Sequence, residues 1–507
     1  MHASNPKTVV PCILWRLLSA TSIALTLVSA IPALAQEVDG DFEGETQYLD
    51  KEGNPRDIKE PTSRDRRKVT DLFPAGKTSS KEEEQAVDDL AHYYINALTL
   101  KKNISVLAEK RKELKNKYLV PCGQKNRTVT DLHTRLNELT LTTCRKVAED
   151  SKYPRAIRYN CILMISDLDS EEYQPGASNS MVPWPAATTA LLEIARDDKQ
   201  YVALRLGAVI GLKRHAGLSV AASLQPQLAE GLVGILATPI GDDSNPDGQV
   251  WLRLAAADVL DMAIEKKIPV DAAKFAAALV ARIGDEQMPN WARARLAGGL
   301  GKLNGRSLPP EQVPLAARSL AGMMLAICQT SPFAVDADAE AQKETKEEAG
   351  KKGSDNKKDK PDPKKDDKPE AAANSVAAEP PSPAVQKVNS EEMMWQLSQI
   401  RAALYGKEAA TSKDKAADPA IGLRAAAGDD ATKTMIDKIV AHIDEIVRLL
   451  ADVPDGKDAS SKLADNLRET SEDLEGMLSA PAAREEEAAP AGKPVAATAV
   501  GNKPAVP

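Results

Sequence analysis

Aromatic residues, histidines and cysteines are scarce in this chain. Of its 507 residues only 4% are aromatic, and it has five histidines and five cysteines. It contains no His-Glu-x-x-His zinc motif, no paired Cys-x-x-Cys and no Gly-x-Ser-x-Gly nucleophile motif. These absences exclude the enzyme classes that such motifs define. No alternation of apolar and polar residues is long enough to predict a strand, which favours an all-α fold.

The first 35 residues have the composition of a secretory signal peptide. Lys7 and Arg16 are their only charged residues, an apolar run extends from Leu17 to Ile31, and Ala33-Leu34-Ala35 forms an A-x-A cleavage site. The run is shorter than the roughly 20 apolar residues that a membrane span needs. We therefore expect cleavage rather than a retained anchor, no stable membrane span afterwards, and a periplasmic or secreted protein.

The charge balance argues against nucleic acid as a partner. The net charge is −8, and loss of the signal peptide, which carries two cationic and no acidic residues, takes it to −10. An acidic chain without a clear basic face lacks the electrostatic signature of a nucleic-acid-binding protein.

Four cysteines follow the signal peptide: Cys122, Cys144, Cys161 and Cys328. An exported chain meets an oxidising environment in which disulfides form, and four cysteines allow three connectivities. Cys144 and Cys161 are expected on consecutive antiparallel helices, which makes them a candidate disulfide pair. The alternative is that they are small buried residues without a bridge.

A short motif recurs four times between residues 158 and 300. An arginine is followed by Tyr or Leu and, in most copies, by two small residues. The copies begin at Arg158, Arg205, Arg253 and Arg295, with separations of 47, 48 and 42 residues. A period of this size is typical of a stacked-helix solenoid. The motif falls on the second helix of each predicted pair. The first helices are expected at Leu132–Val147, Ala186–Ala195, Pro226–Ala237 and Ala272–Ile283.

The motif resembles the HEAT repeat, in which an Arg near the start of the second helix precedes small residues and then a Leu. Leu212 and Leu260 match the later Leu, and Asp247 matches the turn aspartate that this family often has. After the fourth arginine, Lys302 stands where a Leu is expected. The resemblance covers residues 124–304. It implies a right-handed α-solenoid of helical hairpins that acts as a binding or assembly surface.

Changes in composition predict how the chain is divided. An apolar helix at 311–328 needs a partner, and the helical pattern at Glu391–Tyr405 can supply it across a long insertion; a linker between two domains is the alternative. The expected segments are a signal peptide at 1–35, a disordered arm at 36–82, an N-terminal capping helix or hairpin at 83–119, HEAT-like repeats at 124–332, a disordered insertion of charged, Pro and Ala residues at 333–388, C-terminal helices at 389–480 and a disordered tail at 481–507.

Aromatic residues precede three of the motif arginines and are candidates for partner contacts. The alternative is that they fill the seams between repeats. The arginines either line the same surface or form a structural ladder bonded to turn carbonyls or an aspartate. The candidate binding-surface residues are Tyr201, Arg205, Trp251, Arg253, Trp291 and Arg295.

One turn resembles the first half of a calcium loop. Asp243, Asn245 and Asp247 occupy alternate positions before Gly248, as in Asp-x-Asn-x-Asp-Gly. The twelfth position is Leu254 rather than the bidentate Glu of that motif. A solvated turn is therefore the preferred interpretation and calcium the alternative, and no other metal or cofactor is expected.

Two classes of function remain open. The preferred hypothesis is an exported, non-catalytic scaffold whose repeat surface binds protein partners, because no nucleophile, base or metal ligands converge in the sequence. The alternative is an enzyme whose carboxylates and arginines meet in a groove without forming a linear motif. A cluster of buried carboxylates or a closed pocket would favour the enzyme.

Overall fold

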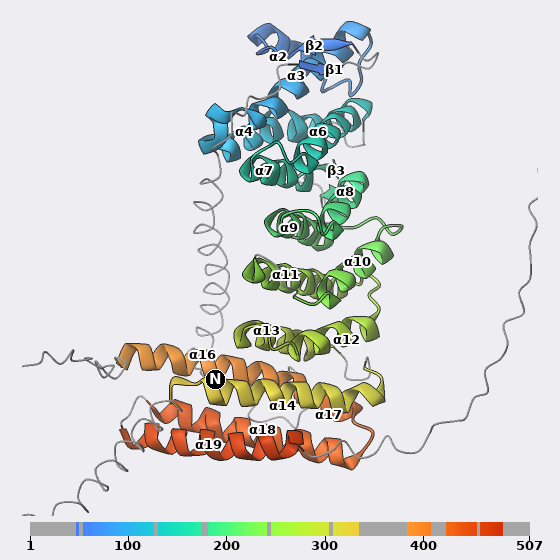
Figure 1. Ribbon diagram of the computed structural model, residues 1–507. Coiled ribbons are helices and arrows are strands. Elements are labelled where there is room, and N and C mark those ends of the chain that lie inside the picture. Colours follow the sequence, from blue (N-terminus) through green and yellow to red (C-terminus); the bar gives the residue numbers. More distant parts are fainter. Residues whose placement is uncertain are drawn as a thin grey trace, which may run out of the picture. The chain divides into compact units, whose positions relative to one another are not determined.

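The protein is all-α, as the sequence predicts (Figure 1). The computed structural model describes residues 47–49, 54–125, 130–173, 181–240, 245–303, 308–333, 383–406, 422–453 and 457–479. Helices take up 77% of these residues, and the only sheets among them are two short two-stranded ones. The signal peptide, most of the insertion and the tail lie outside the described residues. The chain divides into two compact units, Met1–Leu320 with Trp395–Thr432 and Ala321–Met394 with Lys433–Pro507.

The disordered arm predicted at 36–82 is wrong over its described part. The region contains β1 (Gln47–Leu49), β2 (Pro55–Asp57) and α2 (Ser63–Thr70). The two strands pair antiparallel, with Tyr48 opposite Arg56. Thr62 and Asp65 cap α2 reciprocally, each side chain accepting a hydrogen bond from the backbone of the other. One apolar helix residue, Val69, is fully buried. The helix cap and a few buried side chains therefore fold this segment, although its sequence has no apolar periodicity.

The next segment, for which the sequence leaves a single helix or a hairpin open, is a series of helices with a break. Its elements are α3 (Lys81–Thr99), η1 (Lys101–Val106), α4 (Leu107–Leu114), η2 (Lys115–Leu119) and α5 (Val120–Lys125). The break falls at Leu100, whose backbone is extended. Helix α3 packs against α4 and α6, and the hydroxyls of Tyr94 and Tyr118 lie 3.2 Å apart between α3 and η2.

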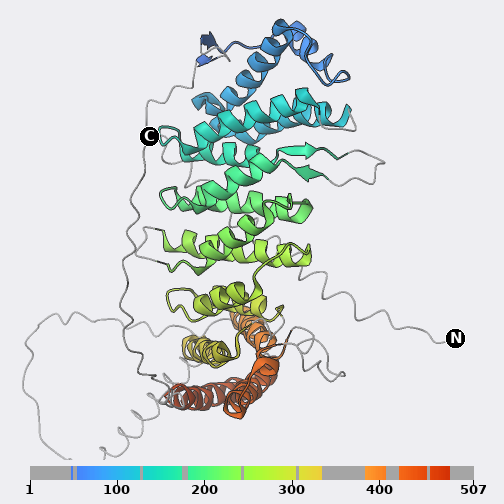
Figure 2. The same ribbon diagram turned by 90° about the vertical axis from the view of Figure 1, so that its right-hand side faces the viewer.

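Four helical pairs follow in unit 1. They are α6 (Asp131–Glu149) with α7 (Arg155–Ser166), α8 (Pro185–Arg196) with α9 (Val202–Leu218), α10 (Gln225–Ala237) with α11 (Pro246–Glu265), and α12 (Ala272–Ile283) with α13 (Asn290–Leu300). The two helices of each pair are in contact, and each second helix also packs on the next second helix, in the order α7, α9, α11, α13 (labelled in Figure 1; Figure 2 turns the same ribbon by 90°). The predicted first helices agree with these bounds to within two residues. Asp271 caps α12 by accepting from the Lys274 N–H.

Glycines allow the second helices to approach closely. A Cβ at Gly207 would lie 2.6 Å from Cε2 of Tyr159 on α7, and one at Gly211 would lie 2.7 Å from Cβ of Ser166. The small residues that follow Arg205 therefore fit α9 against the preceding second helix, α7, as well as against its own partner α8.

A second pair of short strands interrupts the repeats after α7. Strand β3 (Asp169–Glu171) pairs antiparallel with β4 (Val182–Pro183), with Asp169 opposite Pro183. The sequence predicts no strand here, because strands of two and three residues are too short to show an alternating pattern.

Six further helices follow the four pairs among the described residues. They are η4 (Pro310–Gln312), α14 (Val313–Thr330), α16 (Pro383–Tyr405), α17 (Leu423–Ala426), α18 (Asp430–Asp452) and α19 (Lys457–Ser479). Within unit 1, a Cβ at Gly301 would lie 2.5 Å from the carbonyl oxygen of Ala402, so the end of α16 lies against the end of α13. Within unit 2, Gln329 on α14 hydrogen-bonds Glu475 on α19 at 2.9 Å.

The continuous helical segment Pro310–Thr330, which comprises η4 and α14, has the length and apolar composition of a membrane span. Half of its most apolar 18-residue stretch is buried within the protein.

Candidate functional site

The motif arginines bind the carboxyl ends of the preceding helices. Nε of Arg158 donates to the Ala148 carbonyl at 2.9 Å, and Nε of Arg205 donates to the Ala195 carbonyl at 3.0 Å. Arg253, which is 2% exposed, donates to the carbonyls of Thr238 and Pro239. The last carbonyls of a helix lack intrahelical partners and carry partial negative charge. The geometry is therefore that of a structural ladder.

The fourth rung of this ladder is Arg293 and not Arg295, which corrects the repeat alignment. Nε of Arg293 donates to the Ile283 carbonyl at 2.6 Å, ten residues back in the chain, as Arg158 and Arg205 do. Arg293 is also the fourth residue of its helix, like those two arginines. The spacing from Arg253 is thus 40 residues, and the Leu that follows Arg295 led the sequence alignment two residues out of register.

Arg295 belongs instead to an ion-paired surface of the second helices. It contacts Oδ2 of Asp258 on α11 at 2.7 Å, and Lys213 on α9 reaches the same atom at 3.0 Å. Farther along α11, Asp261 forms an ion pair with Lys302. These contacts join three successive second helices through charges.

Tyr201 stands at the amino-terminal edge of the second helices. It is the N-cap residue of α9 and is 47% exposed. The guanidinium of Arg155, at the start of α7, lies 3.5 Å from its ring centroid, and that of Arg158 lies 5.9 Å away. The exposed ring is therefore held by cations of the preceding repeat.

The two candidate tryptophans occupy the same edge of the following repeats. The ring centroids of Trp251 on α11 and Trp291 on α13 are 5.1 Å apart, and both residues are half-buried. Gly248 near the start of α11 lies against Val202 near the start of α9, where a Cβ would be 2.6 Å from Cγ1. We call Tyr201, Trp251 and Trp291 the aromatic edge, because they lie near the starts of three successive second helices.

The calcium-like turn is used as a helix start. Asn245 is the N-cap of α11, and its Oδ1 accepts from the Gly248 N–H at 2.9 Å. Asp247 lies in the first turn of that helix, where a carboxylate complements the helix dipole. Asp243 lies outside the described residues. The two described residues therefore stabilise the start of α11.

The candidate disulfide partners meet between α6 and α7. Cys144 and Cys161 are fully buried free thiols. A hydrogen bond to Cys161 and burial raise the pKa of Cys144 well above its usual value. Cys122 and Cys328 are buried separately, and burial raises the pKa of each to about 12.

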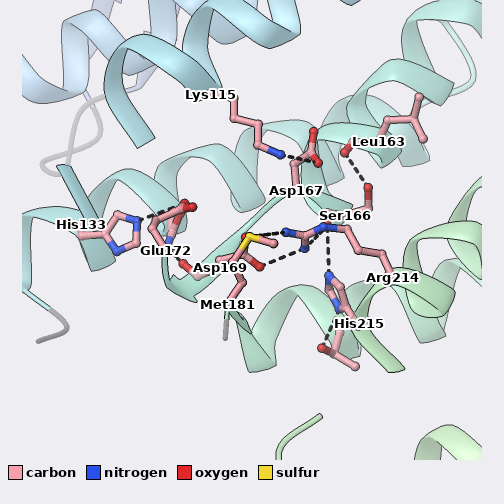
Figure 3. A network of polar contacts seen from close by, with 12 residues as sticks. Lys115, His133, Leu163, Ser166, Asp167, Asp169, Glu172, Met181, Arg214 and His215 are labelled. Atoms are coloured by element: carbon pink, nitrogen blue, oxygen red, sulfur yellow. Dashed lines mark hydrogen bonds and ion pairs between the residues drawn. The ribbon is translucent and has the colours of Figure 1, made fainter. Parts of the chain in front are cut away.

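A buried polar network that the sequence analysis did not identify lies where β3 follows α7 (Figure 3). Asp169, which is fully buried, receives two hydrogen bonds from Arg214 on α9, the one to Oδ1 measuring 2.9 Å. Arg214 also donates to the Ser166 carbonyl at 2.9 Å. Burial raises the pKa of Asp169, and Arg214 opposes that shift. This bidentate pair fixes the start of β3 to the next repeat.

Both ring nitrogens of His215, the residue after Arg214, form hydrogen bonds. Its Nε2 lies 3.1 Å from the Ser166 carbonyl and its Nδ1 lies 2.9 Å from Oγ1 of Thr188. A carbonyl only accepts, so the proton is on Nε2 and Nδ1 accepts from Thr188. Burial lowers the pKa of His215 to about 4, and Arg214 adds to the shift.

At the other end of the network, the side chains of His133 and Glu172 lie close together without a hydrogen bond between them. Nε2 of His133 lies 3.9 Å from Oε1 of Glu172, and the two residues are 1% and 5% exposed. That nitrogen and Oδ1 of Asn137 are buried polar atoms without a hydrogen-bond partner in the described structure. Burial raises the pKa of Glu172 to about 7, with a contribution from Asp169, and burial lowers the pKa of His133 to about 4.

Sequence reasoning missed this network because its members come from five separate elements, α6, α7, β3, α8 and α9. The nearest sequence signal is His133-x-x-x-Asn137, which puts two polar side chains on one face of a helix that is otherwise lined by apolar residues. Glu172 follows a three-residue strand that no pattern predicts.

No protein-family model matches the chain, and no curated protein matches it. A crystal structure of an engineered protein from the Northeast Structural Genomics Consortium aligns with 80% of this chain and 99% of its own at 13% identity, with a TM-score of 0.26. A likeness at that level carries no argument about fold or function.

Proposed function

We propose that this chain is an exported, non-catalytic scaffold of the HEAT-like, right-handed α-solenoid type, which binds a protein partner along its aromatic edge. It acts in the periplasm or outside the cell. Four consecutive helical pairs, the stacking of the second helices and a repeated arginine-to-carbonyl bond support the solenoid assignment.

The observation that carries the proposed function is the Arg155–Tyr201 stack. A tyrosine that is 47% exposed presents a large amphipathic surface. Because Arg155 lies 3.5 Å from the ring centroid, the ring is already oriented before a partner arrives. Tyr, Trp and Arg are the residue types that dominate binding energy at protein interfaces. An anchor that is fixed in advance loses less conformational entropy on binding.

The competing hypothesis, an enzyme, would have its site at the buried network around Asp169. Buried carboxylates are present there, but both oxygens of Asp169 are bonded to Arg214, and Glu172 and His133 are almost fully buried. A catalytic group must reach a substrate atom within hydrogen-bond distance. The accessible candidate residues lie instead on the aromatic edge, which favours binding over catalysis.

Affinity capture from the native envelope extract tests the proposal. The mature chain should retain a stoichiometric protein partner, and Tyr201→Ala should release it. Tyr173→Ala is the matched control, because Tyr173 is similarly exposed at 53% but follows β3, away from the aromatic edge. Equal retention by both variants, or turnover of a small molecule by the purified chain alone, would contradict the scaffold assignment.

Export has its own test. The sequence predicts that the mature protein begins at Gln36, after Ala33-Leu34-Ala35. N-terminal sequencing of the native protein should return that residue. Recovery of a chain that starts at Met1 from the cytoplasm would remove the compartment assignment and leave the binding surface untested by this measurement.

A further inference from the structure

The carboxylate of Glu172 lacks the countercharge that its neighbours have. In the same network, Asp169 is paired with Arg214, and Asp167 is paired with Lys115 at 2.8 Å. No lysine or arginine among the described residues forms an ion pair with Glu172, and its nearest basic group is His133 at 3.9 Å. A buried carboxylate without a cation is costly.

Two further polar atoms of this cluster have no hydrogen bond, and Nε2 of His133 can bind a metal in the tautomer that carries the proton on Nδ1. Nε2 of His133 and Oδ1 of Asn137 are buried and have no hydrogen-bond partner in the described structure. The Asn137 amide is oriented unambiguously, because its Nδ2 donates to the Asp169 carbonyl at 2.9 Å and a carbonyl cannot donate. The oxygen is therefore the atom left free. His133 and Asn137 are one turn apart on the same face of α6.

We propose that His133, Asn137 and Glu172 form a binding site for a divalent transition-metal ion of the zinc class. An imidazole nitrogen and a carboxylate oxygen are ligands that zinc takes in proteins. No group of three or more His, Cys, Asp or Glu side chains in the described part of the chain is placed to hold a metal. We assign the third protein ligand to the amide oxygen of Asn137, because it is buried without a hydrogen bond one helical turn from His133.

The spacing of the pair fits one ion. Zinc lies about 2.0–2.2 Å from imidazole nitrogen and carboxylate oxygen, so two such ligands are at most about 4.2 Å apart. The 3.9 Å between Nε2 of His133 and Oε1 of Glu172 is within that limit. A tetrahedral angle corresponds to about 3.4 Å, so closure on the ion requires a movement of about half an ångström.

The backbone at Gly123 closes over this site. A Cβ there would lie 2.6 Å from Cγ of Glu172 and 3.0 Å from Nε2 of His133. Residue 123 must therefore be a glycine, because a larger side chain there would collide with the side chains of Glu172 and His133. Gly123→Ala would displace the flexible Glu172 side chain away from His133, and the proposal expects weaker metal binding in that variant.

Calorimetric titration of the chelator-treated full chain with Zn²⁺ tests the site. We expect one ion per chain in the wild type and a loss on the order of 100-fold or more in His133→Gln, because removal of a direct ligand exceeds the roughly 10–100-fold effect of an outer-shell partner. His215→Gln is the matched control. That imidazole is equally buried, but both of its nitrogens are already bonded, so its loss should leave the affinity unchanged.

Asn137→Asp keeps the proposal testable if His133→Gln does not fold. The variant loses the donor to the Asp169 carbonyl, so its folding is verified by circular dichroism first; in the folded variant the carboxylate oxygen adds a charged ligand, and Zn²⁺ should bind more tightly. Titration with Co²⁺ should give visible absorption that changes between wild type and Asn137→Asp. Absence of stoichiometric Zn²⁺ uptake by the folded wild type, or equal uptake by folded His133→Gln, would overturn the site and leave the scaffold proposal standing.

Discussion

Nε of Arg293 donates a 2.6 Å hydrogen bond to the carbonyl of Ile283, whereas Arg295, two residues later, points its guanidinium at Asp258 on the neighbouring helix. The first contact closes the end of α12 from inside the protein, since Arg293 is only 5% exposed. The second is a part-exposed ion pair. The two arginines therefore have different energetic roles, and the one that bonds the helix end, Arg293, lacks the following Tyr or Leu of the sequence motif.

Alanine substitution should separate these roles. Arg293→Ala should lower the free energy of unfolding by about 2–3 kcal/mol, because it removes a charged hydrogen bond and leaves a buried carbonyl unpaired. Arg295→Ala should cost about 1 kcal/mol or less, as is usual for a solvent-exposed pair. Urea denaturation of both variants measures the difference. Similar losses in the two would contradict the corrected repeat register.

Glycine substitutions provide a matched test of how the second helices pack. Gly207→Ala should destabilise the protein by about 1–3 kcal/mol, because the new Cβ would lie 2.6 Å from a Tyr159 ring carbon that is held between helices. Gly234→Ala, in α10, has no neighbour within 4 Å and should be stabilising by up to about 1 kcal/mol through helix propensity. Thermal unfolding checks both signs, and a stable Gly207→Ala variant would mean that α7 and α9 are farther apart.

Glu172 should give the stability a distinctive pH dependence in metal-free buffer. Its pKa is about 7 in the folded protein and 4.5 ordinarily, so the folded state binds the proton more tightly. The stabilisation is fully present below pH 4.5 and is lost as the pH rises through 7. The loss is on the order of 3 kcal/mol. Glu172→Gln removes this loss, so the free energy of unfolding of the variant should rise relative to that of the wild type between pH 5 and pH 8.

His133 acts in the opposite direction and must be separated from Glu172. Its folded pKa of about 4 lies below the ordinary 6.5, so its contribution is present above pH 6.5 and is lost as the pH falls through 4. Comparing wild type with Glu172→Gln at each pH cancels this contribution, because both proteins keep His133. If the two proteins differ in free energy of unfolding by the same amount at pH 5 and at pH 8, Glu172 ionises with its ordinary pKa and the prediction is wrong.

The cysteines should behave as one pair and two single thiols. All four are buried, so alkylation of the native reduced protein should be slow and should require unfolding. When the chain refolds with glutathione disulfide, we expect Cys144 and Cys161 to join, because their thiols are already in contact between α6 and α7. Non-reducing peptide mapping reads the outcome. A bridge to Cys122 or Cys328 instead would contradict the packing of these helices.

The sequence predicts the helical pairs well and the site poorly, for physical reasons. Apolar periodicity and helix starts such as Asp271 are local signals, so the first helices are placed to within two residues. The register of the fourth motif depends on which arginine reaches the Ile283 carbonyl, and that choice is made by packing. Residues 54–82 are folded because of the Thr62–Asp65 cap and a few buried side chains. These side chains are too few to form an apolar pattern in the sequence.

The buried network has no linear signature at all. Asp169 and Glu172 follow the end of α7, His133 and Asn137 lie on α6, and Arg214 lies on α9. Their proximity arises only when consecutive helical pairs stack. The exposed Tyr201, in contrast, was identified from its position before a motif arginine, although its stacking on Arg155 required the structure.

The most direct test of the scaffold account is the affinity of the captured partner for Tyr201→Ala and Tyr173→Ala, measured by titration calorimetry against the wild type. A hot-spot tyrosine contributes about 2 kcal/mol or more, so Tyr201→Ala should weaken binding about 30-fold or more. Tyr173→Ala should bind like the wild type, with both variants unfolding at the wild-type temperature. Unchanged affinity in Tyr201→Ala, or an equal loss in Tyr173→Ala, would contradict the claim that the aromatic edge is the binding surface.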